Sequence, residues 1–590
     1  MKTKRILILL MMGFCGFVFS QQTRVHSHND YLQKVPFWGA LYAGATSIEA
    51  DVILKDGQLY VAHDEKSLLK ERTFDNLYLS SIVKAAELGM LTKSPLQILI
   101  DIKTESKSTL AEVVKEIEKY PILQNNPSLS FVISGNRPSP SEYKNYPAFI
   151  MFDHQSLSPL TTEEWEKVAL ISLSVKTFTK WNGKGAPIAT DEKQMNDAIS
   201  TAKKYGKPFR FWAIPDAKSS WEYFARAGVN FINTDQPFLC RTYIEGLSRR
   251  TYTNSKISEI YHPAFATDGS IAPVKNVILL IGDGNGLAQI SSSLLANGGN
   301  LTLSQLKHIG LIKTSSTDNF STDSAAGATA MATGKKTRNR YIGVDPEGNV
   351  LASIPEILKT KGYNTGIITT DEITGATPSA FYAHQPERDM AKEIGKEFLK
   401  STLNLAVAGG KNSFIGQNHF VEVRNPSELA KSKAEQVVMW LSEGSVPSVL
   451  NGRKSILSES VKAGLNFLQS KNKPFFLMVE GAQIDSGGHA NSTGTIITEG
   501  IDFDQAIAEA VKFADQNSGT LVIITADHET GGFSLPHGNL KNNVVEGAFE
   551  TDDHSGIMVP IFSYGPHADE FIGIYENHEV FHKIMKVLAK

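Results

Sequence analysis

Residues 276–284 read Asn-Val-Ile-Leu-Leu-Ile-Gly-Asp-Gly, an apolar run that ends in two glycines around Asp283. A short apolar run without polar alternation is typical of a strand buried on both faces of a parallel sheet. Further runs of this kind lie at residues 365–369, 475–479, 521–525 and 559–564. All but the last lead into an ionisable or glycine-rich segment, and open α/β sheets bind ligands at that end of their strands. The pattern predicts an α/β domain with a mostly parallel sheet and a polar site at its carboxyl edge.

The stretch Thr322-Asp-Ser-Ala-Ala-Gly-Ala328 places a serine at a predicted helix start. Backbone N–H groups at a helix N-terminus attract anions, and the small side chains leave room for a phosphoryl group. Ser324 is therefore a candidate phosphate-attacking hydroxyl, although a serine here is also a common N-cap. Acids and histidines elsewhere in this half favour the nucleophile: Asp283, Glu480, Asp485, His489, Asp527, His528 and His554.

The beginning of the chain resembles a secretory signal peptide over residues 1–20, because Lys2, Lys4 and Arg5 precede an apolar run that closes on small residues. A membrane anchor is the alternative, but the run is shorter than the roughly 18–20 residues that a span needs. We expect a protein exported to the periplasm or the medium, without a stable membrane span.

Size, charge and cysteine usage narrow the class of protein. A chain of 590 residues with 41% hydrophobic and 21% charged residues predicts at least two globular domains. The net charge is −3 and no basic block follows the signal peptide, which excludes nucleic acid as a partner. Cys15 lies in the predicted signal peptide, so Cys240 is left without an internal disulfide partner.

The first half has a different sequence pattern: short apolar runs alternate with helical or turn-rich stretches between residues 23 and 235. This alternation predicts a (β/α)8 TIM-type barrel over residues 22–240. Polar residues fall near the predicted carboxyl ends of its strands, where such barrels hold their active sites: His28, Glu49, Asp51, Asp101, Asp153 and Asp235. We expect residues 241–273 to be a linker and residues 274–590 to be the second domain, with a mainly helical insertion at 394–470.

The second half also supplies metal-ligand chemistry. Hydrolysis of a phosphate monoester requires charge neutralisation, an activated nucleophile and a stabilised leaving oxygen, which two metals about 3.5–4 Å apart can supply. Zinc prefers histidine nitrogen and carboxylate oxygen, whereas magnesium prefers oxygen. Asp485 and His489 stand four residues apart after a predicted strand, and Asp527-His528 follow another. Both kinds of ligand set are therefore present.

Six segments resemble the alkaline phosphatase family, in the family's order over roughly residues 275–588. They are Ile281-Gly-Asp-Gly284, Thr322-Asp-Ser-Ala-Ala326, Ala376-Thr-Pro378, Met478-Val-Glu-Gly-Ala482 with Asp485 and His489, Thr525-Ala-Asp-His528, and Asp553-His-Ser-Gly556. The resemblance implies an α/β/α sandwich with a central mostly parallel sheet, and it is compatible with a homodimer. Sulfatases share this sheet architecture, but Ser324 lacks their Cys/Ser-x-Pro-x-Arg context.

This resemblance implies two zinc ions and one magnesium ion. One zinc would be held by Asp485, His489 and His554, the second by Asp283, Asp527 and His528 with Ser324, and the magnesium by Asp283, Thr377 and Glu480. Ser324 would attack phosphorus to form a phosphoseryl intermediate, and the Arg388 guanidinium would bind two phosphate oxygens. Each ligand taken singly has a plain alternative as a capping acid or a surface histidine.

Two positions depart from the family. Where the family has Asp or His two residues before the magnesium-binding threonine, this chain has Gly375. Where the family often has Lys or His after Asp485, this chain has Ser486. We expect an altered magnesium affinity and pH optimum with activity retained, because the water shell of the third metal loses a partner while every direct ligand is present.

The first half resembles the glycerophosphodiester phosphodiesterase and phosphatidylinositol phospholipase C superfamily over residues 23–240. The resemblance is carried by Arg24-Val-His-Ser-His28, Glu49-Ala-Asp51, Ala62-His63-Asp64, Asp101-Ile-Lys103 and Ile232-Asn-Thr-Asp235. It implies an acid–base pair of His28 and His63, a Ca²⁺ or Mg²⁺ site formed by Glu49, Asp51 and Asp101, and a substrate contact at Lys103. The family's His-Arg-Gly opening is replaced by His28-Asn29-Asp30, which leaves the subclass open.

Together these features predict an exported enzyme for small phosphate mono- and diesters. The barrel would open a diester, and the second domain would remove phosphate from the monoester product. The alternative keeps the phosphatase and makes the barrel a module that binds a lipid headgroup or a glycan. A third interpretation, a structural or adhesive surface protein, would require empty metal sites.

Overall fold

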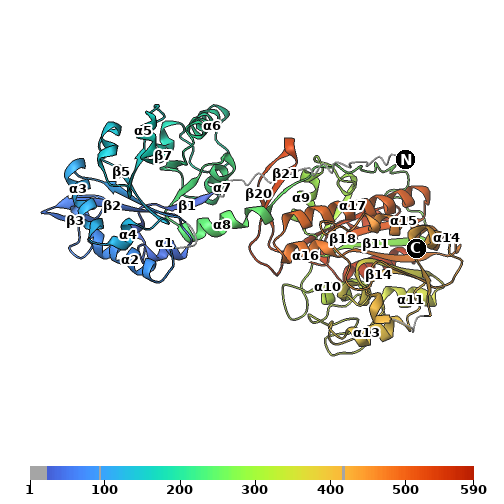
Figure 1. Cartoon of the computed structure of the whole chain (residues 1–590). Helices are drawn as coiled ribbons and strands as arrows, with labels where there is room; N and C mark the ends of the chain where they lie inside the picture. The colour runs from blue at the N-terminus through green and yellow to red at the C-terminus, as the bar shows by residue number, and fades with distance from the viewer. Residues whose placement is uncertain (1–22, 92–94, 415–418) are drawn as a thin grey trace, which may run out of the picture. The chain divides into compact units, whose positions relative to one another are not determined.

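A computed structural model describes residues 23–91, 95–414 and 419–590. The chain divides into two compact units, one that runs through Leu247 and one formed by Ser248–Lys590 (Figure 1). The predicted signal peptide, residues 1–20, lies outside the described residues. In the part of the chain that is described, no helix has both the length and the apolar character that a membrane crossing requires.

Within the described residues, the first unit is a closed barrel of parallel strands, as the sequence predicts. Its strands are β1 (Arg24–Ser27), β2 (Ser47–Lys55), β4 (Leu96–Ile102), β5 (Leu129–Gly135), β6 (Ile150–His154), β7 (Val168–Ser174), β8 (Phe209–Trp212) and β9 (Phe231–Thr234). They pair in chain order, and β1 closes the ring by pairing with β2 on one side and β9 on the other. A further strand, β3 (Gln58–Val61), pairs antiparallel with the end of β2.

Helices cover the outside of this barrel, so that its strands lie within a ring of helices in Figure 1. They are α1 (Trp38–Tyr42), α2 (Ser80–Glu87), α3 (Ser106–Glu118), α4 (Pro121–Gln124), α5 (Thr162–Glu166), α6 (Ala189–Lys204), α7 (Lys218–Ala227) and α8 (Pro237–Arg250). In α3, for example, Leu110, Val113 and Ile117 repeat at helical spacing and are fully buried. Strands covered in this way are buried on both faces, which explains their nearly continuous apolar sequences.

The second unit is built on a mixed, mostly parallel sheet with the strand order β15-β16-β14-β13-β17-β11-β18-β23-β12-β24. The strands are β11 (Asn276–Gly282), β12 (His308–Lys313), β13 (Asn364–Glu372), β14 (Leu405–Gly409), β15 (Val421–Val423), β16 (Val437–Trp440), β17 (Phe475–Gly481), β18 (Thr520–Thr525), β23 (Val559–Tyr564) and β24 (Gly573–Glu576). All five runs predicted as strands are present, and β23 runs antiparallel to β18 and β12.

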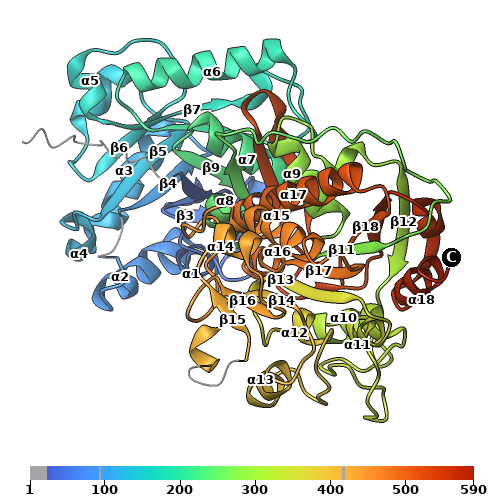
Figure 2. The same ribbon diagram turned by 90° about the vertical axis from the view of Figure 1, so that its right-hand side faces the viewer.

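Helices pack on both faces of this sheet and form an α/β/α sandwich, seen from a second direction in Figure 2. One face packs against α10 (Ser324–Thr333), α11 (Ile354–Thr360), α13 (Ala391–Phe398) and α18 (Glu579–Val587). The other face packs against α14 (Pro426–Lys431), α15 (Ile456–Gln469) and α17 (Thr493–Gln516). Each face therefore has its own hydrophobic core, and the sheet lies between them.

Two local predictions are wrong. The interval 394–470, expected to be mainly helical, contains the strands β14, β15 and β16 in addition to α14 and α15. The interval 241–273, expected to be a linker, begins inside α8 and includes β10 (Thr251–Thr253), which pairs with β21 (Val544–Ala548). Residues 254–273, all of them described, form no helix or strand.

A buried carboxylate organises the first loop of the barrel. Asp30, in the segment that departs from the family's His-Arg-Gly opening, is 0% exposed. It accepts hydrogen bonds from the Phe37 backbone at 2.6 Å, the Ser27 hydroxyl at 2.9 Å and the Tyr78 hydroxyl at 3.0 Å. Burial raises the pKa of Asp30 despite these bonds. The loop after β1 is therefore tied to the barrel through one acid.

Replacement of Asp30 tests how much this carboxylate contributes to the stability of the barrel. We expect Asp30→Ala to destabilise the barrel by about 3 kcal/mol, because three donors, one of them a backbone N–H, lose their acceptor. Exposed Asp64, which caps a surface turn through Lys66 and Ser67, is the control, and Asp64→Ala should cost less. Urea denaturation followed by tryptophan fluorescence is suitable, because Trp38, Trp165, Trp181, Trp212 and Trp221 lie in this unit. Equal losses for the two variants would contradict the expectation.

Candidate active sites

The register of three neighbouring strands brings the predicted ligands of the second unit to one edge. β11 pairs in parallel with β17 on one side and β18 on the other, so the carboxyl ends of all three lie together. Asp283 follows β11, Glu480 lies near the end of β17, and Asp527 and His528 follow β18. The short helix α16 (Gln483–His489) carries Asp485 and His489, and β22 (His554–Ser555) carries His554.

Ser324 begins α10, as the sequence predicts, but it is not the cap of that helix. Asp323 is the N-cap, and its carboxylate accepts a hydrogen bond from the Ala326 backbone at 3.0 Å. Ser324 is 3% exposed, and its Oγ lies 3.2 Å from His528 Nε2. The hydroxyl is therefore released from capping and lies against His528 of the ligand cluster.

The first metal-ligand group is formed by Asp485, His489 and His554, whose ligand atoms all lie within 4.8 Å of one another. His489 Nε2 lies 3.2 Å from Asp485 Oδ2 and 3.2 Å from His554 Nε2. The Nδ1 atoms face backbone carbonyls, at 2.6 Å from Asp552 for His489 and at 2.9 Å from Thr322 for His554. Carbonyls in these positions favour protonated Nδ1 atoms, which leaves both Nε2 lone pairs for a cation. This set of one carboxylate and two imidazoles suits zinc.

A second group comprises Asp283, Asp485 and His528, again within 4.8 Å of one another. The Asp485 carboxylate is therefore within reach of both groups. Asp527, which sequence reasoning assigned to this ion, has its Oδ2 at 3.3 Å from His528 Nε2, and Asp283 Oδ1 lies 3.4 Å from the same nitrogen. Asp283 Oδ1 and Asp527 Oδ2 are buried without a hydrogen-bond partner among the described residues. Two such oxygens facing one imidazole fit a divalent cation.

The third predicted site is built only from oxygen donors. Glu480 is 1% exposed and accepts a hydrogen bond from Thr369. Thr377, in α12 (Ala376–Ser379), has a buried hydroxyl without a hydrogen-bond partner among the described residues, and it is close enough to lower the pKa of Glu480. Burial and the charge of Asp371 nevertheless raise the pKa of Glu480 well above its ordinary value. Thr369 and Asp371 were missed by sequence reasoning.

The protonation of the acids follows from their burial and mutual repulsion. Burial and then the neighbouring carboxylates Asp527, Asp485 and Glu480 raise the pKa of Asp283 well above its ordinary value. Burial and Asp485 raise the pKa of Asp527 to about 7. Divalent cations would offset this repulsion, and the residues present fit the zinc and magnesium ligand sets expected from the sequence.

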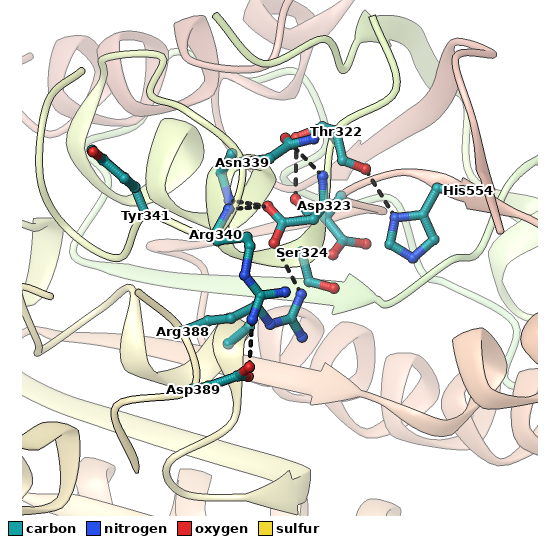
Figure 3. A network of polar contacts seen from close by, with 12 residues as sticks. Thr322, Asp323, Ser324, Asn339, Arg340, Tyr341, Arg388, Asp389 and His554 are labelled. Atoms are coloured by element: carbon teal, nitrogen blue, oxygen red, sulfur yellow. Dashed lines mark hydrogen bonds and ion pairs between the residues drawn. The ribbon is translucent and has the colours of Figure 1, made fainter. Parts of the chain in front are cut away.

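Arg388 is fixed beside the serine by the capping acid. Its Nη1 donates to Asp323 Oδ2 at 3.1 Å, and its side chain is 29% exposed. Asp323 thus caps the helix with one oxygen and holds the guanidinium with the other (Figure 3). Arg340 lies nearby but pairs with Glu387 and Asp389. Arg388 is therefore the arginine positioned to bind an anion that reaches Ser324.

The mouth of the barrel gathers the residues predicted for a diesterase. Glu49, Asp51 and Asp101 place their ligand oxygens within 4.8 Å of one another. Lys103 Nζ lies 3.0 Å from Asp51 Oδ2 and 3.0 Å from Asp101 Oδ1. Burial raises the pKa of Asp101 to about 6, although Lys103 opposes the shift.

The two predicted acid–base histidines have separate carboxylate partners. His28 Nδ1 lies 2.7 Å from Asp235 Oδ1, and His63 Nδ1 lies 3.0 Å from Asp51 Oδ2. Burial lowers the pKa of His28, but the hydrogen bond with Asp235 and nearby acids outweigh it, and the net shift is upward. Asp153, also found at a strand end, instead accepts hydrogen bonds from Ser134 at 2.9 Å and Ser172 at 2.6 Å inside the barrel.

Three further residues at this mouth escaped sequence reasoning. His26 is fully buried between Ser47 and Glu49, with 2.7 Å to each, and burial with the Arg210 charge lowers its pKa to about 3. Arg210 donates to Glu49 at 3.2 Å, and the Tyr31 hydroxyl donates to Asp51 at 2.9 Å. The position of His26 two residues before His28 was a usable signal, because strand periodicity directs alternate residues to one side.

The fold and these sites define a metal-dependent phosphatase joined to a TIM-type barrel. Residues 274–419 and 410–544 match the sequence model for alkaline phosphatase, and residues 20–93 match that of the AIM6-like phosphodiesterase domain. Alkaline phosphatase 4 of Bacillus subtilis is 33% identical over 336 residues, which cover 52% of this chain and 73% of that protein. Alkaline phosphatase of Escherichia coli is 28% identical over 407 residues, 54% of this chain and 86% of that protein.

Solved structures agree with these relatives. The alkaline phosphatase from the Antarctic bacterium TAB5 is 40% identical with a TM-score of 0.51, covering 54% of this chain and 99% of that one. A variant of the TAB5 enzyme, 39% identical with a TM-score of 0.51 over 56% of this chain and 99% of that one, was solved with Mg bound in its M3 site. The chain belongs to the alkaline phosphatase family of phosphomonoesterases.

Removal of metal should make the stability of the second unit depend on pH. The folded-state pKa values of Asp527, Asp283 and Glu480 lie above their ordinary values, so the folded metal-free protein binds more protons than the unfolded chain. Stability is therefore lost as the pH rises through the folded pKa values, and the raised pKa of His489, about 9, acts in the same direction. The lowered pKa of His528 affects only more acidic conditions.

We expect the chelated protein to lose unfolding free energy as the pH rises from roughly 6.5 to 9, with a slope of about 1.4 kcal/mol per pH unit for each net proton that the folded state holds in excess. Calorimetric unfolding of chelated and metal-reloaded protein across this range measures the effect. Reloading should flatten the profile, because cations bind the ionised carboxylates. A flat profile in the chelated protein would show that these acids do not carry the predicted charge penalty.

Loss of the guanidinium beside Ser324 should impair hydrolysis more than folding. We expect Arg388→Ala to lower kcat/KM for a chromogenic phosphate monoester by about 10²–10³-fold, since an oriented charged donor next to the reacting phosphate is lost. Arg340→Ala is the matched control, and the loss of an exposed ion pair should cost less than about fivefold. Similar losses in both variants would refute a specific role for Arg388.

Proposed function

We propose that the second unit hydrolyses phosphate monoesters through a phosphoseryl intermediate at Ser324. The observation that carries this proposal is the position of the Ser324 hydroxyl, which lies 3.2 Å from His528 Nε2 at a helix N-terminus, beside the Arg388 guanidinium held by Asp323. An anion that reaches the hydroxyl meets a guanidinium and free backbone N–H groups together.

The ligand sets support two zinc ions and one magnesium ion. Asp485, His489 and His554 would hold one zinc, Asp283, Asp527 and His528 the other, and Asp283, Thr377 and Glu480 the magnesium. When bound, these cations would lower the pKa of a hydroxyl or water and neutralise phosphate charge. The magnesium in the TAB5 variant supports the third assignment.

Side chains and backbone of the second unit would bind the phosphate, supply the nucleophile and stabilise the charge. Arg388 binds two phosphate oxygens and orients phosphorus toward Ser324 Oγ. Ser324 Oγ then forms a bond to phosphorus as the alkoxide of the substrate leaves. Water later attacks the phosphoserine, which returns the serine and releases phosphate. The N-terminus of α10 would stabilise the phosphoryl charge, because backbone N–H groups at the start of a helix favour negative charge.

The barrel is proposed to hydrolyse glycerophosphodiester-like substrates upstream of the phosphatase. His28 and His63, each paired with a carboxylate, would act as base and acid, and Glu49, Asp51 and Asp101 would hold Ca²⁺ or Mg²⁺. Fusion to a phosphatase keeps the monoester product close to the enzyme that consumes it. The match of residues 20–93 to a phosphodiesterase domain supports this role.

One observation favours the alternative, in which the barrel only binds a phosphorylated headgroup. Lys103 lies 3.0 Å from oxygens of both Asp51 and Asp101, so an ammonium group already neutralises the acids expected to hold a cation. A barrel that keeps this arrangement would bind an anion without turnover. Export through the segment 1–20 and assembly as a homodimer also stay predictions.

The two units can be tested separately with glycerophosphocholine as substrate. We expect Ser324→Ala to release choline normally but to accumulate glycerol phosphate, with phosphate release lowered on the order of 10⁴-fold or more. We expect His63→Ala to leave the diester intact while hydrolysis of an added monoester continues. The control is His262→Ala, an exposed histidine that bonds to Gln305. Normal choline release by His63→Ala would overturn the diesterase and leave the binding module.

A further inference from the structure

The space that a side chain at residue 375 would occupy is filled by the carboxylate of Asp371. A Cβ added at residue 375 would overlap Asp371 Oδ2 and would lie 2.6 Å from Asp371 Cγ. The backbone of Gly375 has φ −58° and ψ 160°, which any L-residue can adopt. The conformation of residue 375 therefore does not call for glycine, but with Asp371 in its present position a carboxylate fills the space that a side chain at residue 375 would enter.

The Asp371 carboxylate is fixed by hydrogen bonds on one side only. Its Oδ1 accepts from the Glu372 backbone at 2.7 Å, and its own backbone N–H donates to Thr369 Oγ1 at 2.8 Å. Thr369 in turn donates to Glu480, so Asp371 and Glu480 share one connecting side chain. The hydrogen bonds of Asp371 to other described residues thus use Oδ1 and the backbone N–H, and Oδ2 is the oxygen that lies at residue 375.

Two buried oxygens of the proposed magnesium site lack hydrogen-bond partners among the described residues. Thr377 Oγ1 and Asp283 Oδ1 belong to residues that are 1% and 7% exposed, and neither atom has a hydrogen-bond partner among the described residues. Glu480, 1% exposed, experiences the charge of Asp371 directly. These donors are all oxygens, which is the preference of Mg²⁺ with its retained waters. Buried oxygens without partners cost free energy, and a cation with its waters would supply the missing contacts.

We propose that Asp371 supplies the carboxylate that residue 375 lacks, and that its Oδ2 holds the water shell of a Mg²⁺ bound by Glu480, Thr377 and Asp283. This inference rests on the magnesium site of the proposed function. It revises the expectation that the water shell of the third metal loses a partner, because an acid from four residues upstream restores the missing oxygen. Asp371 acts here as a positioning residue, through waters on the ion, and not as a group that touches the substrate.

The test is magnesium binding to zinc-loaded protein by titration calorimetry, with magnesium and zinc content measured by mass spectrometry. We expect Asp371→Asn, which keeps the shape and removes the charge, to weaken Mg²⁺ binding by about 10- to 100-fold with zinc content unchanged. The melting temperature without magnesium should stay near that of the wild type, whereas its rise on magnesium addition should be lost. The matched control is Glu372→Gln, because the Glu372 carboxylate bonds to Ser445 at 2.8 Å.

A transplanted carboxylate makes the test specific. Asp371→Gly combined with Gly375→Asp moves the acid to residue 375, into the volume that the Asp371 carboxylate has left. We expect this double variant to bind Mg²⁺ within about fivefold of the wild-type affinity, a smaller loss than that predicted for Asp371→Asn. Gly375→Asp alone should bind poorly, since two carboxylates would compete for one space. Wild-type affinity in Asp371→Asn, or no recovery in the double variant, would overturn the proposed role of Asp371 but would leave the proposed magnesium site intact. Absence of Mg²⁺ binding by the wild-type protein would overturn the proposed magnesium site as well.

Discussion

The second unit depends on one electrostatic constraint: several carboxylates are buried together at the carboxyl edge of a parallel sheet. The register of β11 against β17 and β18 sets this arrangement, because Ile281 lies opposite Glu480 on one side and Thr525 on the other. Residues that follow these positions cannot avoid one another. Burial and repulsion raise the pKa values of Asp283 and Glu480, and proteins accept such a cost mainly at sites that bind cations or perform chemistry. Like charges at this edge thus connect the fold to the chemistry.

The loop before α10 resolves a local conflict between stability and function. A helix start requires a cap, whereas a nucleophile requires a free hydroxyl, and one serine cannot meet both demands at once. The chain assigns the cap to Asp323, whose second oxygen holds Arg388. The same acid therefore stabilises the helix, leaves the Ser324 hydroxyl free of capping and fixes the Arg388 guanidinium, which is proposed to bind phosphate. This sharing explains why an acid precedes the serine in a region otherwise composed of small residues.

Sequence reasoning succeeded where burial on both faces leaves a strong signal. The central strands of both units are nearly continuous apolar runs, and each was recognisable without its neighbours. It failed at β16, because Val437, Val438 and Met439 form too short a run to separate a strand from a helix face. Only pairing with β14 decides the outcome, and that contact is not local. The ligands were predictable as residue types in motifs, whereas their partners Asp323, Thr369 and His26 depend on tertiary distances.

Asp371 illustrates a general limit of motif comparison. A motif records which residue type stands at a sequence position, but a metal site requires an oxygen at a place in space. Two positions four residues apart in a turn can deliver a carboxylate to the same volume, and glycine at one of them makes room for the other. A comparison by position therefore registers a loss at Gly375 and overlooks the gain at Asp371.

The two units neutralise their buried acids in different ways, and this difference governs how each can use a cation. In the barrel, Arg210 and His26 contact Glu49, and Lys103 bridges Asp51 and Asp101. A divalent cation that binds these acids would compete with the Lys103 ammonium for Asp51 Oδ2 and Asp101 Oδ1, and a displaced ammonium would be free to contact a substrate phosphate. Cation and substrate binding would be linked there through one lysine, because the same group serves either the acids or the phosphate. In the phosphatase unit Arg388 lowers the pKa of Asp283, whereas the neighbouring acids Asp527, Asp485 and Glu480 raise it, so a cation there would relieve repulsion among acids. Basic side chains of the fold thus contact the barrel acids, whereas the phosphatase acids repel one another in a way that cations would relieve.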